Sequence, residues 1–449
     1  MTVTPERLLR WNRPGPRYTS YPTAPQWTTE LSDSAVNTAL QGLRDPCSVY
    51  VHIPFCREQC SFCGCNMVVA GRREPGTRYL DALERQIDAL ALPAEVVNVA
   101  RIHLGGGTPT WLSPKELERL YGMLYRRFRR VPGAEISVEA DPEVTTDEHV
   151  DMLASLGVNR LSMGVQSFDP VVLAAVNRPQ AQTRVSDVLA RARTHGMYSL
   201  NLDLMYGLPH QDEASLADTL MRTLEMRPDR LAVFGYAHVP WMKTHMKKLE
   251  IDALPSPEVR ARSMLLVHDT LVAQGYQAVG FDHFALVDDE LAVAQREKRL
   301  HRNFMGYTTR PDLDLVGLGM SAISEVGRTF SQQKSKLSHW WEAVERGEPV
   351  VEKGLVMTDD DLLRRDVINR LMCNYELPYA AFDRSHGGSF RERFAAELVA
   401  LEPLVDEGFV TVDDERIAIT DDGRWFSRHV AMAFDAYLGK TGGRFSPTV

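Results

Sequence analysis

The chain has 449 residues, of which 44% are hydrophobic and 25% charged, and its formal net charge is -9. This length permits two or three domains around a large core, and the composition is ordinary for a globular protein. The acidic balance disfavours a nucleic-acid partner, and no apolar run approaches the ~20 residues that a membrane-spanning helix needs. The N-terminal stretch MTVTPERLLRWN carries charges where a signal peptide is apolar, so we expect a cytoplasmic protein without a membrane partner.

Short apolar strands alternate with helical patterns up to about residue 240. We expect the strands at SVYVHI ending at Ile53, RIHLGG from Arg101, EISVEAD from Glu135, RLSMGVQ from Arg160, SLNLDLMYG from Ser199 and LAVFGYAHV from Leu231. The spacing of the leucines in TRYLDALERQIDAL predicts an amphipathic helix, and Ser113–Glu116 predicts a capping box that starts another helix. Six β-α repeats predict a parallel sheet that is curled into a barrel or a partial barrel.

The alternation ends after about residue 275. The segment GFDHFALVDDELAVAQREKRLHRNFMGYTT is dense in aromatic, histidine and acidic residues, which favours a lid or a substrate wall. Two amphipathic helices are predicted at DLLRRDVINRLMCNYEL and RERFAAELVALEPLVDEGF, followed by a hairpin at FVTVDDERIAIT. This order suggests a winged-helix-like module, and its acidic turn at 413–415 favours packing over DNA binding.

A dense cysteine group follows the first strand in PFCREQCSFCGCN, at Cys56, Cys60, Cys63 and Cys65. The first three have the spacing C-x3-C-x2-C, so they can hold three irons of a 4Fe-4S cluster and leave the fourth iron open to a small molecule. Structural zinc would want four ligands, usually from two separated pairs. Disulfides fit less well, because the chain is long and carries no secretion signal. The spacing favours the cluster.

The remaining cysteines have weaker interpretations. Cys65 could supply a fourth thiolate, although it follows Cys63 by only two residues. Cys47 and Cys373 stand alone, which is typical of small buried residues. His52 lies within a strand pattern and is expected to be a structural histidine with satisfied hydrogen bonds.

Polar residues recur at the carboxyl ends of the predicted strands, where parallel sheets bind ligands. They are the run Gly105–Pro109, Glu139 with Asp141, Gln166, and Asp203 with Tyr206. A glycine run permits close backbone approach, and exposed N–H groups would suit a carboxylate such as that of methionine. Each feature alone has a plain alternative, a tight turn or a solvated acid. Their position in successive repeats predicts one shared site.

The order of the motifs carries a resemblance. The segments GPRYTSYPTA, YVHIPFCREQCSFCGCN, GGGTPT, SVEADP, GVQSFDP, NLDLMYGLP, GYAHVP, FDHFAL, DDELAVAQRE, LHRNFMGYTT and GLGMSAIS run from about Arg17 to Tyr437. This order resembles the oxygen-independent coproporphyrinogen III dehydrogenases, radical S-adenosylmethionine enzymes of haem synthesis. The resemblance implies an α/β fold, a partial (β/α)6 TIM-like barrel over 41–275, with an N-terminal arm over 1–40 and a mainly helical C-terminal domain over 276–449.

The resemblance also implies site residues. Cys56, Cys60 and Cys63 would ligate the cluster, and a first S-adenosylmethionine would contact Tyr50, Gly106, Glu139 and Ile323. A second S-adenosylmethionine would contact Phe62, Gly107, Thr108, Gln166, Arg178, Asp203 and Ala237. Catalytic roles would fall to Tyr50, Glu139, Phe304 and Ile323.

The implied reaction converts two propionates of coproporphyrinogen III to vinyl groups through a 5′-deoxyadenosyl radical, giving protoporphyrinogen IX. It needs an electron donor of the flavodoxin or ferredoxin type, and the family suggests a monomer. A substrate with four carboxylates calls for basic residues at the barrel mouth, and Arg17, Arg302 and His301 are candidates by motif position. Each of them could instead pair within the fold.

Two methionines depart from the family pattern. Met305 and Met246 stand where the family commonly has glutamine, which replaces a hydrogen-bonding side chain by one with almost no such capacity. They either fill space or mark a divergent paralogue, such as a haem chaperone, another tetrapyrrole-modifying enzyme or a methyltransferase. The GCN run and the long C-terminal part argue against the chaperone.

Overall fold

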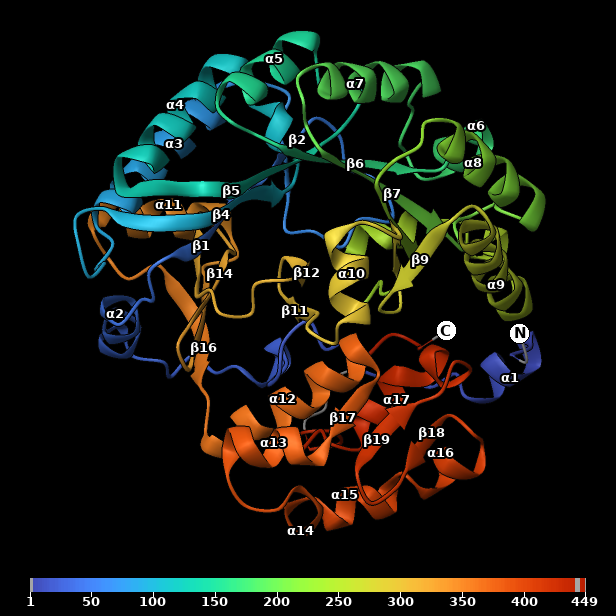
Figure 1. The fold of residues 1–449 in the computed structure, drawn as a ribbon. Helices are drawn as coiled ribbons and strands as arrows, with labels where there is room; N and C mark the ends of the chain where they lie inside the picture. Colours follow the sequence, from blue (N-terminus) through green and yellow to red (C-terminus); the bar gives the residue numbers. More distant parts are fainter. Residues whose placement is uncertain (1–2, 441–444, 449) are drawn as a thin grey trace.

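The computed structural model describes residues 3–440 and 445–448. Its centre is a twelve-stranded sheet with the order β16-β15-β14-β13-β1-β4-β5-β6-β7-β8-β10-β9 (Figure 1). The parallel part contains the six predicted strands: β1 (Cys47–Ile53), β4 (Val97–Gly106), β5 (Phe128–Ala140), β6 (Arg160–Gln166), β7 (Ser199–Tyr206) and β8 (Arg230–Gly235). The predicted partial barrel is confirmed, and β4 and β5 begin several residues earlier than predicted.

Helices cover the outer, convex face of the sheet in an arc (Figure 1). They are α3 (Glu74–Asp88), α4 (Pro114–Arg127), α5 (Asp147–Ser155), α6 (Pro170–Ala175), α7 (Gln182–Thr194), α8 (Glu213–Glu225) and α9 (Pro257–Ala273). Leu80, Leu83 and Ile87 are buried on the predicted face of α3, and burial of each such side chain contributes about 1.5–3 kcal/mol. The predicted capping box starts α4: Glu116 N–H donates to the Ser113 hydroxyl, and the Glu116 carboxylate accepts from Ser113 N–H.

The sheet extends past the six predicted strands at both edges. β13 (Leu315–Leu318) pairs in parallel with β1 and is followed by antiparallel β14 (Ile323–Val326), β15 (Thr329–Gln333) and β16 (Val351–Val356). At the other edge, β10 (His283–Leu286) pairs with β8, and β9 (Tyr276–Val279) pairs with β10. The sequence analysis did not predict these strands, because each is only four to six residues long and their alternation is weak.

The C-terminal part has its own apolar core beside the barrel. Its elements are α12 (Asp359–Asn374), α13 (Tyr379–His386), α17 (Ser427–Met432), and the small sheet β17 (Glu376–Pro378), β19 (Arg416–Ile419) and β18 (Val410–Val412). The predicted hairpin is β18 and β19. The second predicted helix is wrong as one helix, since it is divided into α14 (Phe390–Arg393), α15 (Ala395–Ala400) and α16 (Glu402–Asp406). Phe394 leaves helical geometry at φ -110°, ψ 28°, and Pro403 removes a donor in the first turn of α16.

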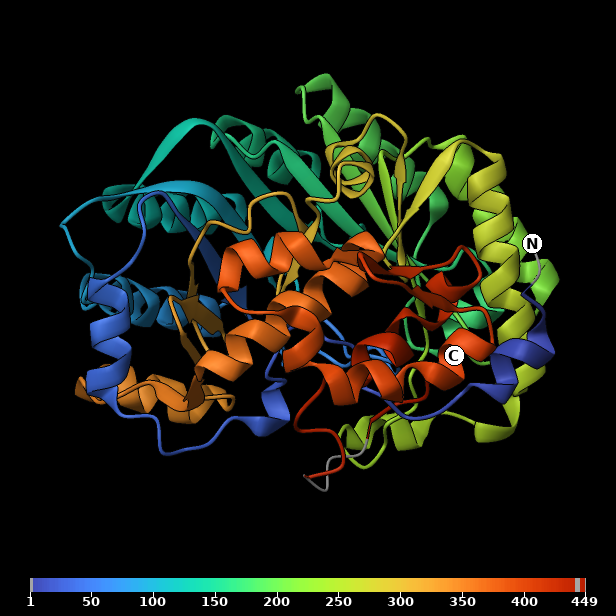
Figure 2. The same ribbon diagram turned by 60° about the horizontal axis from the view of Figure 1, so that its bottom comes forward.

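The first residues form an arm that runs along the C-terminal elements (Figure 2). After α1 (Pro5–Arg10), the Trp11 ring packs edge-on to Phe409 at 5.5 Å and to His429 at 5.9 Å. Further on, the Tyr18 hydroxyl donates to Asp435 at 3.0 Å. After η1 (Ala24–Gln26), α2 (Asp33–Gln41) precedes β1. The domain boundaries at residues 40 and 275 stay a prediction.

The segment predicted as a lid or substrate wall holds β10, α10 (Glu290–Arg296) and a two-stranded hairpin of β11 (His301–Asn303) and β12 (Gly306–Thr308). Within the described residues, no helix combines the length and the apolar character that crossing a bilayer requires.

Candidate active site

The cysteine loop lies at the carboxyl end of β1 and lines a cavity of about 520 Å³, which we call the cysteine cavity. The loop leaves β1 through the short pair β2 (Phe55–Cys56) and β3 (Val68–Val69). The predicted site residues that line this cavity are Cys56, Cys60, Phe62, Cys63, Gly106, Gly107, Thr108, Glu139, Gln166, Arg178 and Asp203. The structure therefore brings together residues from the ends of β1, β4, β5, β6 and β7, as the strand-end pattern predicts.

Backbone and side-chain contacts fix the loop without using the thiols of Cys56, Cys60 and Cys63 as its anchors. Ser61 N–H donates to the Val176 carbonyl at 2.9 Å, and the Asn177 amide donates to the Gln59 carbonyl at 3.0 Å. On the other side, His245 Nε2–H donates to the Cys63 carbonyl at 2.8 Å. The three sulfur atoms also have contacts, with the Thr108 hydroxyl at 3.3 Å, with Arg178 at 3.4 Å and with Cys65 N–H at 3.4 Å, but these contacts supplement the carbonyl and amide contacts that hold the loop.

The charge balance of the three thiols fits iron ligation. Burial raises the pKa of Cys56 to about 12, so a thiolate there needs a compensating positive charge. Burial also raises the pKa of Cys60, although the Arg178 guanidinium at 3.4 Å opposes it. A hydrogen bond from Cys65 lowers the pKa of Cys63.

The three thiols suit a 4Fe-4S cluster by their chemistry. In such a cluster each thiolate binds its own iron. Cys56, Cys60 and Cys63 line one cavity and could hold three of the irons.

The glycine run packs the end of β4 against the start of the cysteine loop. A Cβ on Gly107 would lie 2.7 Å from the Pro54 carbonyl group, and one on Gly106, at φ +116°, would lie 2.5 Å from the His52 ring. Gly107 N–H donates to Ile53, and Thr108 N–H donates to Phe55, both at 2.8 Å. The expectation that these N–H groups are free for a ligand carboxylate is wrong, because β1, the loop and Glu139 already accept from them.

Two acids line the cysteine cavity, and their pKa values are shifted in opposite directions. Burial alone would raise the pKa of Glu139, but hydrogen bonds from His103 at 3.4 Å and Gly106 N–H at 3.1 Å lower it. Burial and the nearby charge of Glu139 raise the pKa of Asp203 to about 6, although Asn201 donates to it at 2.6 Å. The pair offers two carboxylate acceptors near pH 7, of which Asp203 is the one that is more easily protonated, and both suit hydroxyl and ammonium groups on one ligand.

Arg178 joins the cysteine loop to the ends of β5 and β6. Its guanidinium lies 3.2 Å from Asp141 and 3.4 Å from the Cys60 sulfur, and it donates to the Gly164 carbonyl. Its Nε has no hydrogen-bond partner among the described residues although it is buried. A buried donor without an acceptor favours a ligand atom at this point.

Tyr50, Phe304, Ile323 and Ala237 do not line the cysteine cavity. Tyr50 stacks on His103 at 5.9 Å and donates to His52, which donates in turn to the Asn66 carbonyl at 2.8 Å. His52 is thus the satisfied structural histidine that was predicted. The Phe304 ring packs against Trp27 and Phe330, with Ile323 beside them.

Arg302 and His301, two of the candidates for binding substrate carboxylates, have structural roles. The Arg302 side chain is 7% exposed, lies 3.7 Å from Asp282 and stacks on Phe281 and Tyr307. Burial lowers the pKa of His301 to about 4, so this imidazole is neutral near pH 7. Neither offers a free positive charge.

Met246 fills space in the 3-10 helix η3 (Thr244–Lys248), where it packs with Phe62, Met205 and Tyr236. Met305 lies in the turn between β11 and β12, and its N–H donates to the Asn303 side chain at 2.9 Å. Cys47 and Cys373 are buried free thiols, as predicted.

Comparison with known proteins identifies close relatives. A model of the radical SAM superfamily matches residues 50–222, and a model of the HemN C-terminal domain matches residues 357–426. The oxygen-independent coproporphyrinogen III oxidase of Escherichia coli is 43% identical over 96% of this chain and 94% of its own length. The protein of the same name from Pseudomonas aeruginosa is 40% identical over 96% and 95%. The solved structure of the Escherichia coli protein, described as a radical SAM enzyme, matches with a TM-score of 0.92 over 94% of this chain and 98% of that chain.

Proposed function

This chain belongs to the family of oxygen-independent coproporphyrinogen III oxidases, and on that premise we propose that it converts two propionate side chains of coproporphyrinogen III to vinyl groups. The observation that carries the proposal is the convergence of three cysteines with the strand-end residues of β4 to β7 around one cavity. The 43% identity over nearly the whole chain supports the same substrate. It favours the oxidase over a haem chaperone or a methyltransferase.

The enzyme is a radical SAM enzyme whose cofactors are a 4Fe-4S cluster and S-adenosylmethionine. We assign the cluster to Cys56, Cys60 and Cys63, because their thiols line the cavity and their loop is fixed independently of them. When bound, the cluster and S-adenosylmethionine supply the 5′-deoxyadenosyl radical that removes a hydrogen atom from the substrate propionate.

The chain's own contribution is to hold the ligands and to exclude water. Ionised Glu139 accepts hydrogen bonds from an ammonium or a ribose, and Asp203 donates or accepts as its proton allows. Phe62 is a partly buried apolar side chain that lines the cavity and packs on the apolar cluster of Met205, Tyr236 and Met246 behind it, which limits access of solvent from that side. We keep two S-adenosylmethionine sites as a proposal, the first with Tyr50, Gly106, Glu139 and Ile323, and the second with Phe62, Gly107, Thr108, Gln166, Arg178, Asp203 and Ala237.

We also propose the face on which the electron donor docks. The loop after β8 touches the cysteine loop, since Lys243 donates to the Cys65 carbonyl at 3.1 Å. This loop and η3 expose Trp241, Met242, Lys247 and Lys248. An apolar centre with a basic rim suits a small acidic electron carrier of the flavodoxin or ferredoxin type. A monomer in a reducing cytoplasm completes this proposal, because a cluster near the surface needs protection from oxidation.

The test is an anaerobic assay of the reconstituted protein with S-adenosylmethionine, a strong reductant and coproporphyrinogen III, with the products followed by mass. We expect loss of two carboxyl groups and formation of 5′-deoxyadenosine, both abolished by Cys56→Ser. Formation of 5′-deoxyadenosine without loss of carbon dioxide would show that the radical machinery works on another substrate. Haem binding without either product would favour the chaperone.

A further inference from the structure

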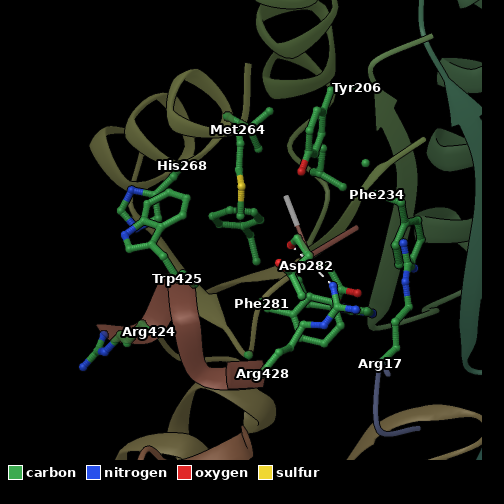
Figure 3. Close-up of a pocket in the computed structure, with 18 of the residues that line it drawn as sticks. Arg17, Tyr206, Phe234, Met264, His268, Phe281, Asp282, Arg424, Trp425 and Arg428 are labelled. Carbon is green, nitrogen blue, oxygen red and sulfur yellow. Dashed lines mark hydrogen bonds and ion pairs between the residues drawn. The ribbon is translucent and has the colours of Figure 1, made fainter. Parts of the chain in front are cut away.

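A second cavity of about 740 Å³ opens between the barrel, the N-terminal arm and the C-terminal domain (Figure 3). We call it the arginine cavity, because Arg17, Arg260, Arg424 and Arg428 line it. Aromatic side chains cover much of the rest of its wall: Tyr206, Phe234, Tyr236, Phe281, Tyr375 and Trp425. Except for Ala237, none of the residues assigned above to the cluster or to S-adenosylmethionine lines it.

Three of these guanidinium groups lack a carboxylate partner. Within the described residues, the side chains of Arg17 and Arg260 form neither a hydrogen bond nor a salt bridge. In the part of the chain that the structure describes, Arg428 donates to the backbone carbonyls of residues 15, 16 and 448, which are neutral. Burial, with the neighbouring charges of Arg17 and Arg302, lowers the pKa of Arg428 to about 10. Positive charge therefore gathers here in a chain whose net charge is -9.

The acids on the same wall already have other partners. One oxygen of Asp282 accepts from His283 at 2.6 Å, and its carboxylate lies 3.7 Å from Arg302. Its Oδ2 has no hydrogen-bond partner among the described residues, and its negative charge also acts on Arg17 and Arg428 from beyond salt-bridge distance. Asp421 pairs with Arg424 at 3.1 Å, and Asp422 pairs with Arg7 at 3.1 Å. In Figure 3 the Arg424 side chain points away from the cavity. Among residues 3–440 and 445–448, no carboxylate lies within salt-bridge distance of Arg17, Arg260 or Arg428, an arrangement that favours an anionic ligand.

The side chains that line the arginine cavity indicate which kind of anion would fit it. The Trp425 ring lies 4.9 Å from the His268 ring in one part of the wall, and Arg17 and Phe234 line another part (Figure 3). The Tyr206 hydroxyl and Asp282 point toward the middle between them. Aromatic faces suit a flat apolar ring, and guanidinium forks suit carboxylates. A flat ring that carries several carboxylates matches both features.

One strand connects the arginine cavity to the cysteine cavity. On β7, Asp203 lines the cysteine cavity, and Tyr206, three residues later, lines the arginine cavity. The side chain of Arg260 passes beside Gly207, at 3.5 Å from the position of an added Cβ. A ligand in the arginine cavity would thus reach the end of the strand that holds a predicted S-adenosylmethionine contact.

We propose that the arginine cavity binds the carboxylates of the tetrapyrrole that are not reacting, with Arg17 and Arg260 as the residues that recognise them. This inference rests on the proposed function. Arg17 and Arg260 thereby determine which propionate is presented to the cysteine cavity, in the first round and again in the second. Arg428 adds charge from the back of the wall and holds residues 15 and 16 of the arm in place.

The first test uses coproporphyrin III, the stable oxidised form of the macrocycle, in an equilibrium titration of the anaerobic holoenzyme. Arg17→Gln and Arg260→Gln should each weaken binding about tenfold, as expected for loss of one charge-assisted contact. Arg17→Lys should retain most of the affinity. The matched control is Arg262→Gln on α9, whose guanidinium pairs with Glu213 at 2.6 Å and does not line the cavity, and it should bind like the parent.

The second test is turnover of coproporphyrinogen III. Both glutamine variants should raise KM and release more of the product that has lost only one carboxyl group, while 5′-deoxyadenosine still forms. Binding and product ratios equal to those of Arg262→Gln would overturn the inference. So would an Arg17→Lys variant that binds as weakly as Arg17→Gln and melts at a lower temperature, because the side chain would then serve the fold.

The inference and the proposed function can fail separately. If the parent enzyme decarboxylates coproporphyrinogen III and the two arginine variants are indistinguishable from it, the function stands and the inference is wrong. If coproporphyrin binding depends on both arginines and the parent enzyme removes no carboxyl group, the inference stands and the proposed reaction is wrong.

Discussion

Glu139 and Asp203 show how two acids in one cavity acquire pKa shifts of opposite direction. They lie on β5 and β7, on either side of β6, and His103 and a backbone N–H stabilise the charge of Glu139, whereas Asp203 has one amide donor. The pKa of Glu139 is lowered and that of Asp203 is raised. The sequence alone cannot reveal the lowered pKa of Glu139, because its donors lie on another strand, β4.

The raised pKa of Asp203 predicts a pH-dependent cost to stability. Its folded pKa of about 6 lies above the ordinary value of an aspartate, so its favourable contribution is complete below about pH 4 and is lost as the pH rises through 6. Asp203→Asn should therefore raise the free energy of unfolding at pH 7.5 by roughly 1–3 kcal/mol and leave it unchanged near pH 4. Thermal melts at both pH values check this, with Asp187→Asn on the exposed face of α7 as control. An equal effect at both pH values would contradict it.

Whether Cys65 supplies a fourth thiolate to the cluster can be tested directly by single substitutions. Cys56→Ser and Cys60→Ser should lose the visible absorption of the reconstituted cluster and all 5′-deoxyadenosine formation, because three thiolates are the minimum for a site-open cluster. Cys65→Ser should keep both, since the main contact of this residue is a backbone N–H donated to the Cys63 sulfur at 3.4 Å. Loss of the cluster in Cys65→Ser would make it a ligand.

At the scale of elements, α3 holds the start of the cysteine loop through one side chain. The buried Tyr79 hydroxyl donates to the His52 carbonyl at 2.6 Å and accepts from Met320 N–H at 3.0 Å. It thus ties the end of β1 to the turn that follows β13. A close approach supports this packing, because a Cβ on Gly319 would lie 2.2 Å from the same hydroxyl.

Removal of that hydroxyl should loosen the site. Tyr79→Phe leaves a buried carbonyl and a buried N–H unpaired, which costs about 1–3 kcal/mol in the free energy of unfolding, and we expect faster loss of the cluster to a chelator. The control is Tyr125→Phe, whose hydroxyl donates to the Leu156 carbonyl at 2.7 Å on the far side of α4. If the control loses its cluster as fast as Tyr79→Phe, the effect is general destabilisation and the proposed link is wrong.

The elements differ in how far the sequence predicts them. The six parallel strands, β1 and β4 to β8, are predictable because each is a largely buried apolar run and helices lie between them. The strands β13 to β16 are not, because LVGL and ISEV are short and are recognisable as strands only through their neighbours in the sheet. The residues that line the cysteine cavity follow from strand ends in the sequence. The roles of Arg260 and Arg428 do not, because they depend on where the arm and the C-terminal domain lie.

At the scale of the whole molecule, the proposed docking face for the electron donor predicts that charge reversal there affects turnover with reduced flavodoxin and not turnover with dithionite. Lys247→Glu and Lys248→Glu should raise KM for a reduced flavodoxin severalfold at low salt, because they reverse charges on the rim of that face. Turnover driven by dithionite should stay at the parent level. Lys115→Glu on α4 is the charge-matched control, since Lys115 does not line the cysteine cavity. Equal KM values for all three variants would contradict the docking face.

The arm is a structural part of the C-terminal domain although it lies at the other end of the sequence. Trp11 packs on Phe409, and its carbonyl accepts from His429 at 2.7 Å. Trp11→Ala should therefore lower the free energy of unfolding by about 1–3 kcal/mol, less than the cost of removing a fully buried aromatic ring because Trp11 is only partly buried. Limited proteolysis should then cut the chain first after residues of the arm. An unchanged melting temperature and an unchanged cleavage pattern would show that the arm is dispensable.

The residues that the N-terminal arm packs against are synthesised long after the arm itself. Arg7 pairs with a residue 415 positions later, and the same separation divides Tyr21 from Ala436. At about 5–20 residues per second, the ribosome needs roughly 20–80 s to cover that distance. Throughout this time the C-terminal partners of the arm's aromatic side chains do not yet exist, so these side chains are exposed and can be bound by a chaperone. The wall that contains Arg17 is thus the last part of the enzyme to assemble, although Arg17 is among the first residues to be synthesised.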